Sequence, residues 1–178
     1  GADGYGCGAG WWMPAPSGVQ MRKLLDNDPK HAEKFLRQLD AQRRSLRESL
    51  LLALLNGESS PQTLEAMRVV SINLDGPWFS AALLSWESEA LARNIESLIQ
   101  SIESLTTDST GFYAVQLDKR PMLVVLVSSD DEETFPALTD ILSEIFEMEM
   151  RQSPRIGCGR PVSSIAQIPT SLSDAMLK

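Results

Sequence analysis

The sequence is poor in the residues that build disulfide frameworks and metal centres. Its 178 residues include two cysteines, Cys7 and Cys158, far apart in the chain, and a single histidine, His31. Two cysteines make no disulfide framework, and no spacing typical of a zinc site is present. We expect both thiols to be unpaired, as in a reducing cytosol. His31 has no Ser or Cys partner at a telling spacing, so we expect no catalytic or metal-binding role for it.

Long apolar runs and an excess of positive charge are also missing. No stretch approaches the ~18 apolar residues that span a bilayer, and no signal peptide is recognisable. We therefore expect a cytoplasmic segment without membrane contact. Acidic residues outnumber basic ones 24 to 16, which gives a net charge of −8. General nucleic-acid binding needs excess positive charge to displace counterions, so this function is not expected of the chain itself.

The composition that remains is that of a globular protein. Hydrophobic residues make up 43% and charged residues 22% of the chain, which is long enough for one ordinary domain and an appendage. Residues 1–20 are rich in Gly and Pro, but no strand precedes the glycines and no Lys-Ser/Thr follows, as a phosphate-binding loop requires. We interpret them as a linker or a remnant of an upstream domain. Because the chain begins with Gly1 rather than Met, we expect it to be a piece of a longer protein.

A helical pattern occupies residues 21–75. Asp28-Pro29 signals a helix start, and Gly57 is expected to cap the C-terminus of that long helix. A shorter helix is predicted from Pro61 to Val70. The charged residues of the long helix are typical of a solvated face, and the alternative is a signalling helix that pairs with its copy in a homodimer. Its apolar stripe, at three- and four-residue spacing, consists of Phe35, Leu36, Leu39, Leu46, Leu50 and Leu54.

From Gly76, where we place the start of the main domain, strands and helices alternate. The order is βαββαβ, which predicts an α+β fold: an antiparallel ferredoxin-like sheet with helices on one face, preceded by the helical segment. The uninterrupted apolar run Met122–Val127 predicts a strand buried on both faces, and we expect its hairpin with the preceding strand to form the middle of the sheet. The predicted strands are residues 78–86, 111–117, 122–127 and 155–162, and the predicted helices are residues 87–105, 132–150 and 171–178.

Two stretches of the chain resemble a known family. Residues 156–165, IGCGRPVSSI, followed by Ile168-Pro169-Thr170-Ser171 and Asp174-Ala175, resemble the "IGIGRPV…L..IP.SY.EA" ending of degenerate GGDEF-like domains. Residues 47–58, RESLLLALLNGE, and residues 74–79, LDGPWF, resemble the start of the same module. The resemblance covers about residues 43–178. Such domains occur in bacterial transcription regulators of the AraC type, including two-component response regulators, and of the PucR/CdaR type.

The resemblance implies a nucleotidyl-cyclase-like fold and indicates where chemistry would occur in it. An active diguanylate cyclase carries Gly-Gly-Asp/Glu-Glu-Phe at the central hairpin. The glycines let the backbone approach the nucleotide. The acidic residues bind magnesium together with an aspartate at the end of the first strand. Here the turn is residues 117–121, LDKRP, with no glycine pair and one acid, and Trp86-Glu87 ends the first strand. Glu87 and Asp118 are metal candidates only if the domain is active. We interpret them as ordinary surface charges and expect no catalysis, metal or cofactor.

Three further features have an ordinary and a functional interpretation. The acidic run of residues 130–133 is expected to cap the following helix rather than bind a cation. Gly157 and Gly159 are expected to mark a bulge or tight packing against a helix rather than close approach of a ligand. Arg155 and Arg160 flank the last strand and are candidates for binding an anion.

Together these features favour a non-catalytic regulatory and dimerisation module of a bacterial transcription regulator. It would couple an upstream sensor to a downstream helix-turn-helix DNA-binding domain that lies outside this chain. One alternative is a sensor domain that binds a small molecule or nucleotide without reacting. The other alternative is a divergent nucleotide cyclase or a phosphodiesterase-like relative.

Overall fold

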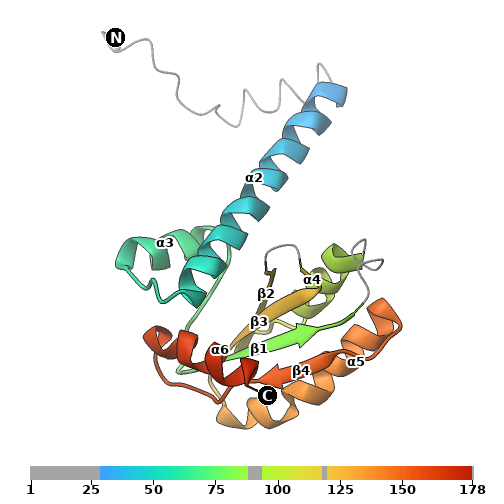
Figure 1. The fold of residues 1–178 in the computed structure, drawn as a ribbon. Helices are drawn as coiled ribbons and strands as arrows, with labels where there is room; N and C mark the ends of the chain where they lie inside the picture. Colours follow the sequence, from blue (N-terminus) through green and yellow to red (C-terminus); the bar gives the residue numbers. More distant parts are fainter. Residues whose placement is uncertain (1–28, 88–93, 118–119, 178) are drawn as a thin grey trace. The chain divides into compact units, whose positions relative to one another are not determined.

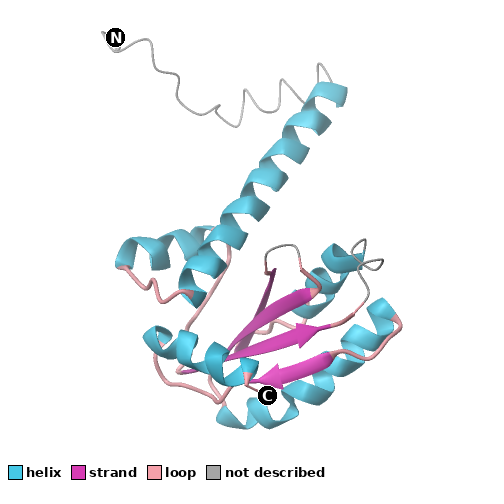
Figure 2. Cartoon of the chain, viewed as in Figure 1, coloured by secondary structure: helices cyan, strands magenta, loops and turns pink. Residues whose placement is uncertain are grey.

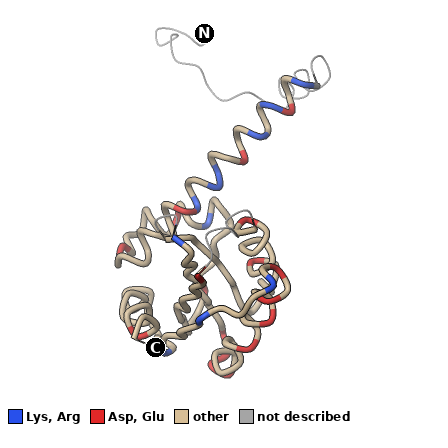
Figure 3. Tube along the Cα trace, turned by 45° about the vertical axis from the view of Figure 1, so that its right-hand side comes forward, with Lys and Arg blue, Asp and Glu red and all other residues tan. Residues whose placement is uncertain are grey.

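The computed structural model describes residues 29–87, 94–117 and 120–177. The predictions for residues 1–28, including Cys7, for residues 88–93 and for Asp118 and Lys119 lie outside these ranges. Contacts divide the chain into two compact units, residues 1–43 and 44–178, and helix α2, Pro29–Leu55, contributes to both. Basic and acidic residues are interspersed along α2 (Figure 3), and Glu33 and Arg37 form an ion pair of 3.6 Å one turn apart. Within the described ranges, no helix is both long and apolar enough to cross a bilayer.

The second unit contains a four-stranded sheet in which every neighbouring pair is antiparallel. The strands lie in the order β2-β3-β1-β4 (Figure 1), which is the order of a split βαβ arrangement. This confirms the predicted α+β fold with a βαββαβ chain order. The strands are β1 (Trp78–Ser85), β2 (Thr110–Gln116), β3 (Met122–Ser129) and β4 (Arg155–Cys158). The helices between them are α4 (Ile95–Glu103) and α5 (Leu138–Met150), and a 3-10 helix at Glu132–Ala137 precedes α5.

Strand β3 occupies the centre of the sheet, as its apolar run predicts. It pairs with β1 from Trp78↔Ser129 to Ser85↔Met122 on one side, and with β2 on the other. All five residues of 123–127 are buried. The hairpin prediction is right for β3 and wrong for β2, which is an edge strand. The faces of β2 are nevertheless covered, so residues 111–115 are buried like those of a central strand, and its residue pattern therefore did not distinguish the two positions.

Alternate residues of each strand point to opposite faces and build two separate cores. The two crossover helices α4 and α5 cover one face, as predicted. The prediction of helices on one face is incomplete, because the last turns of α2 together with α3 (Pro61–Val69) and α6 (Ile168–Met176) cover the other face (Figure 2). The first core includes Leu84, Leu98, Phe112, Val125, Leu142 and Phe146, and the second includes Leu51, Leu54, Met67, Tyr113, Leu126 and Ile168.

The compact unit consequently starts at Arg44, whereas the sequence places the start of the main domain near Gly76. The reason is that Leu51, Leu54 and Leu55 are core residues packed with the sheet, not the stripe of an independent helix. The short helix α3 belongs to the same core through the buried Met67. The turn-rich sequence near Gly76 directly precedes the first strand of the sheet.

The predicted end of the long helix at Gly57 is confirmed, whereas the helix predicted at residues 132–150 begins as a 3-10 helix, Glu132–Ala137, and the helix predicted at residues 87–105 is described as Ile95–Glu103. Gly57 adopts φ +96°, and the N–H groups of Gly57 and Glu58 donate to the carbonyl groups of Leu54 and Ala53, which is a Schellman cap. Within the acidic run, the side chain of Asp131 caps the 3-10 helix by accepting from the N–H of Glu133 at 2.9 Å, as predicted for this run.

A buried polar seam joins β1, β4 and α6. The hydroxyl of Ser171, on α6, accepts from the N–H of Ala81 at 3.1 Å and donates to the carbonyl of Arg160 at 2.8 Å. Ser80 donates to the carbonyl of Gly159 at 2.8 Å. A Cβ on Gly159 would overlap the carbonyl oxygen and hydroxyl of Ser171, so this glycine serves tight packing, as expected. Strand β4 is shorter than predicted, and α6 begins at Ile168, before the predicted Ser171.

Candidate functional site

The end of β1 adjoins the β2–β3 hairpin, which is where the family resemblance places the chemistry. The N–H of Trp86 donates to the carbonyl of Pro121 at 3.1 Å. Arg120, which precedes Pro121, is exposed, and its N–H donates to the carbonyl of Leu117 on the other arm of the turn at 2.8 Å. Asp118, one of the two metal candidates, lies outside the described residues. The structure therefore places only one of them, Glu87, at this end of the sheet.

Trp86 and Glu87 have opposite environments. Trp86 is 6% exposed and belongs to the core under α4 and α5, where its ring lies 5.3 Å from that of Phe146 between centroids. Glu87 is exposed. The position that ends the first strand is thus filled by an apolar ring packed on α5, and the neighbouring Glu87 is exposed at this end of the sheet. Among the residues that the structure describes, no three His, Cys, Asp or Glu side chains are grouped to hold a metal ion.

A pocket of about 240 Å³ opens at this end of the sheet. Ser85 and Arg155 face each other in the β1–β4 register, and the segment between α5 and β4 completes the lining. Of the two predicted anion-binding arginines, Arg155 is at this pocket. Arg160 does not line it, and its N–H donates instead to the carboxylate of Asp174 at 2.9 Å. The lining residues are Ser85, Trp86, Glu87, Gln152, Ser153 and Arg155.

The polar groups of this pocket are incompletely matched. The hydroxyl of Ser153 donates to the carboxylate of Glu147 at 3.1 Å. The Nε2 atom of Gln152 is buried and has no acceptor among the described residues. Glu87 and Arg155 do not belong to the ion pairs formed by the described residues. The pocket is therefore lined by a carboxylate and a guanidinium with capacity to bind a further group, whereas the buried amide nitrogen is not open to it.

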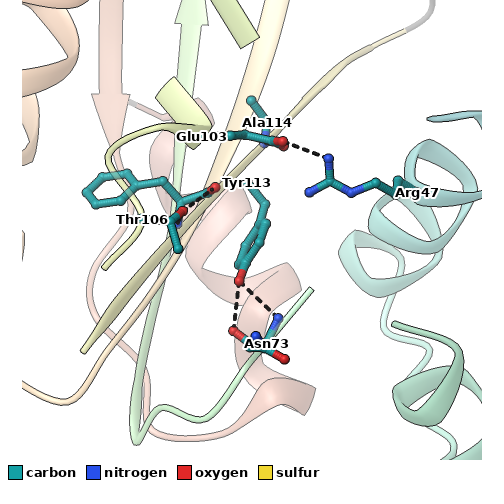
Figure 4. A network of polar contacts seen from close by, with 7 residues as sticks. Arg47, Asn73, Glu103, Thr106, Tyr113 and Ala114 are labelled. Atoms are coloured by element: carbon teal, nitrogen blue, oxygen red, sulfur yellow. Dashed lines mark hydrogen bonds and ion pairs between the residues drawn. The ribbon is translucent and has the colours of Figure 1, made fainter. Parts of the chain in front are cut away.

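A second cavity, of about 280 Å³, lies at the other end of the sheet, where β2 begins and β3 ends. Its charged residues are all acidic: Asp75, Asp108 and Asp130. Tyr113 also lines it, and its hydroxyl accepts from the N–H of Asn73 at 2.9 Å and donates to the carbonyl of the same residue at 3.1 Å (Figure 4). Burial raises the pKa of the Tyr113 hydroxyl above its ordinary value, so this group stays neutral at physiological pH.

A polar network connects α2 to the free edge of β2 (Figure 4). One carboxylate oxygen of Glu103, at the end of α4, accepts from Arg47 of α2 at 2.7 Å, and the other accepts from the N–H of Ala114 at 3.1 Å. The hydroxyl of Thr106 accepts from the N–H of Phe112 at 3.0 Å. Both N–H groups belong to the edge that faces away from β3. Side chains of the domain thus already bond to the backbone N–H groups of β2 that another strand would need in order to pair with this edge.

Sequence reasoning did not single out Arg47, Glu103, Tyr113 or Gln152. Arg47 is one of many charges on the predicted solvated face of the long helix, and Glu103 falls within a predicted helix without an interpretation of its own. They lie 56 positions apart, so no local spacing indicates the pair. Tyr113 was counted as a β-former, and its hydrogen bonds to Asn73 depend on the loop before β1. A signal for Gln152 exists only in three dimensions, because its burial creates the unmatched donor.

Comparison with known proteins identifies one matching family. The family model described as a GGDEF-like domain matches residues 56–177, more than half of the chain. The match begins within the compact unit of the structure and includes α3, the whole sheet and α6. No curated protein matches the chain.

Proposed function

We propose, from the premise that this chain belongs to the GGDEF-like domain family, that it is a non-catalytic regulatory module of a bacterial transcription regulator of the AraC or PucR/CdaR type. In this role it works in the cytoplasm and couples an upstream sensor to a downstream helix-turn-helix domain elsewhere in the same protein. It also helps that protein to form a homodimer.

The observation that carries the proposal is the burial of Trp86. Magnesium-dependent nucleotide chemistry needs carboxylate oxygens at the end of the first strand and a backbone open to the phosphates at the hairpin. The residue at the end of β1 is instead a tryptophan packed against Phe146. The hairpin sequence has no glycine pair, and Pro121 restricts its backbone. These features support a domain whose fold serves shape and contact rather than turnover.

Coupling is supported by the way the last turns of α2 are built into the domain. Leu51, Leu54 and Leu55 pack in the same core as β2, β3 and α6. The ion pair between Arg47 and Glu103 ties the preceding turn of α2 to α4, and through the other carboxylate oxygen to β2. Because closely packed cores transmit displacements rather than absorb them, a change in α2 would be felt by the sheet.

Dimerisation is supported by the apolar residues that α2 leaves exposed. Leu36, Leu39 and Leu46 are 41–45% exposed, and they follow the three- and seven-residue spacing of a coiled-coil seam. A second copy of α2 would cover these leucines. The flanking charges of both signs fit the charged positions beside such a seam.

The proposal is tested by measuring mass and turnover on the same purified chain. Light scattering coupled to size-exclusion chromatography is expected to give the mass of a dimer, and incubation with GTP or ATP and Mg²⁺ is expected to give no cyclic product by chromatography. An active diguanylate cyclase serves as the positive control. A strict monomer at high concentration would contradict the dimer, and a cyclic product that disappears in a Glu87→Gln variant would contradict the non-catalytic role. A helix-turn-helix pattern in the coding sequence after Lys178 would support the placement in a transcription regulator.

The tie between α2 and α4 gives a second prediction, on the Arg47–Glu103 pair. A double-mutant cycle of Arg47→Met and Glu103→Gln is expected to show a coupling energy of about 1–2 kcal/mol in urea unfolding, because both side chains are largely buried, at 26% and 18% exposure. The matched control is the Arg44–Glu96 pair, with the same N···O distance of 2.7 Å but 57% and 69% exposure, for which we expect less than about 0.5 kcal/mol. Equal coupling energies in the two cycles would show that the Arg47 tie is an ordinary surface pair.

A further inference from the structure

We propose that the pocket at the end of β1 binds a small zwitterion of the amino-acid class, with a carboxylate and an ammonium group on one compact molecule. The proposal does not depend on the regulatory role, because it rests only on the residues that line the pocket. These come from three places: the end of β1, the segment after α5 and the first residue of β4.

The charges of the pocket carry the first step. Glu87 supplies a carboxylate and Arg155 a guanidinium, both exposed, and the two side chains do not pair with each other among the described residues. Two opposite charges that line one pocket without forming an ion pair fit a ligand that carries both. An arginine guanidinium binds a carboxylate through two parallel hydrogen bonds, and a glutamate accepts from an ammonium group.

The second step is which side of the pocket takes which charge. Arg155 is the basic residue among the described residues that line the pocket, so the anionic group of the ligand is assigned to its side. Ser153, two positions before it, is already engaged with Glu147. Gln152 also lines the pocket, but its Nε2 atom is buried from solvent, so this donor is not offered to the ligand.

The size and charge of the pocket decide between a small zwitterion and a nucleotide. Its volume of about 240 Å³ is below the ~300–1,000 Å³ of sites for larger ligands. Among the described residues that line it, Arg155 is the one basic residue, and Glu87 adds a negative charge. A triphosphate would meet one guanidinium and a repelling carboxylate here. A molecule with one charge of each sign meets one partner for each.

The test uses the whole chain and calorimetric titration with glycine, L-serine and L-glutamate as zwitterionic probes. Acetate and methylammonium carry one of the two charges each. We expect at least one amino acid to bind and the single-charge probes to bind about tenfold more weakly or worse, because each leaves one charged group unmatched. Arg155→Gln and Glu87→Gln are each expected to weaken amino-acid binding about tenfold. Both replace exposed side chains, so their thermal unfolding should match that of the parent chain.

Arg68→Gln is the matched control, since Arg68 is an exposed arginine on α3 and does not line the pocket. Its amino-acid binding is expected to equal that of the parent chain. The absence of binding by all three amino acids would overturn the proposal. So would binding that survives both Arg155→Gln and Glu87→Gln. The proposal would also be overturned if acetate bound as tightly as the amino acids. The same holds if GTP bound more tightly than they do and Arg155→Gln abolished GTP binding. In both cases the site would recognise an anion alone.

Discussion

Replacement of Gly159 by alanine is expected to destabilise the domain by at least about 3 kcal/mol, a large part of the ~5–15 kcal/mol that stabilises an ordinary domain. The added Cβ would overlap the carbonyl oxygen and Oγ of Ser171 and lie 2.6 Å from its carbonyl carbon. Two of these atoms belong to the main chain of α6, so no side-chain rotation relieves the contact. Overpacking in a core commonly costs about 1–3 kcal/mol, and displacement of the buried Ile168 and Ala175 adds to it.

The measurement is urea unfolding followed by circular dichroism, with Gly57→Ala as the comparison. Gly57 has a positive φ, but a Cβ there would meet only Pro169 at an ordinary 3.6 Å. The Gly57→Ala variant should therefore lose about 1 kcal/mol of unfolding free energy. Gly159→Ala in a Ser171→Ala background should stay destabilised, because the carbonyl group of residue 171 remains in place. A Gly159→Ala variant with the parent's urea midpoint would show that α6 can move off β4 without loss.

The parts of the fold that follow from local pattern could be predicted from the sequence. The apolar run at 122–127 indicates a strand buried on both faces, and β3 is the central strand. Gly57 after a leucine stripe indicates a helix end, and the positive φ is present. In both cases the signal and the structure involve the same few consecutive residues. Such signals do not depend on what the rest of the chain does.

The parts that depend on distant contacts could not be predicted in this way. An apolar stripe on α2 does not say whether a sheet or another helix will cover it, so the boundary near Gly76 divided residues that share one core. Likewise, β2 has the residue pattern of an interior strand, because both of its faces are buried. One face is covered by α4, and Tyr113 packs in the core on the other. Side chains of Thr106 and Glu103 bond to its free edge.

The candidate site shows the same division. Glu87 was selected as a metal candidate and Arg155 as an anion candidate, for separate reasons and at separate places in the chain. Antiparallel pairing of β1 with β4 brings Ser85 opposite Arg155, and so places both charges at one pocket. Residue types could be selected from the sequence, but their combination depends on strand order. It is this combination on which the proposed binding of a molecule with two charges rests.

Trp86 gives the prediction that bears most directly on the proposed non-catalytic role. Trp86→Ala is expected to cost about 3–5 kcal/mol, because a fully packed ring is removed from the core beside Phe146. Trp86→Asp, which would install the carboxylate that an active cyclase carries at the end of its first strand, should cost more, since it leaves the same cavity and adds a buried charge. We expect this variant to be largely unfolded, as measured by circular dichroism and urea titration.

Two comparisons separate this explanation from general sensitivity of the strand. Trp86→Phe keeps an aromatic ring in the core, so its unfolding free energy should fall much less than that of the alanine variant. Trp78→Ala, at the other end of β1, removes a half-buried ring from the same core. Its unfolding free energy should also fall less than that of Trp86→Ala. A Trp86→Asp variant that stays folded and binds Mg²⁺ would mean that the end of β1 still has room for a metal site. If it unfolds as expected, Trp86 is a required part of the core, and a metal-binding carboxylate at this position would require rebuilding the packing of α5 as well as the hairpin.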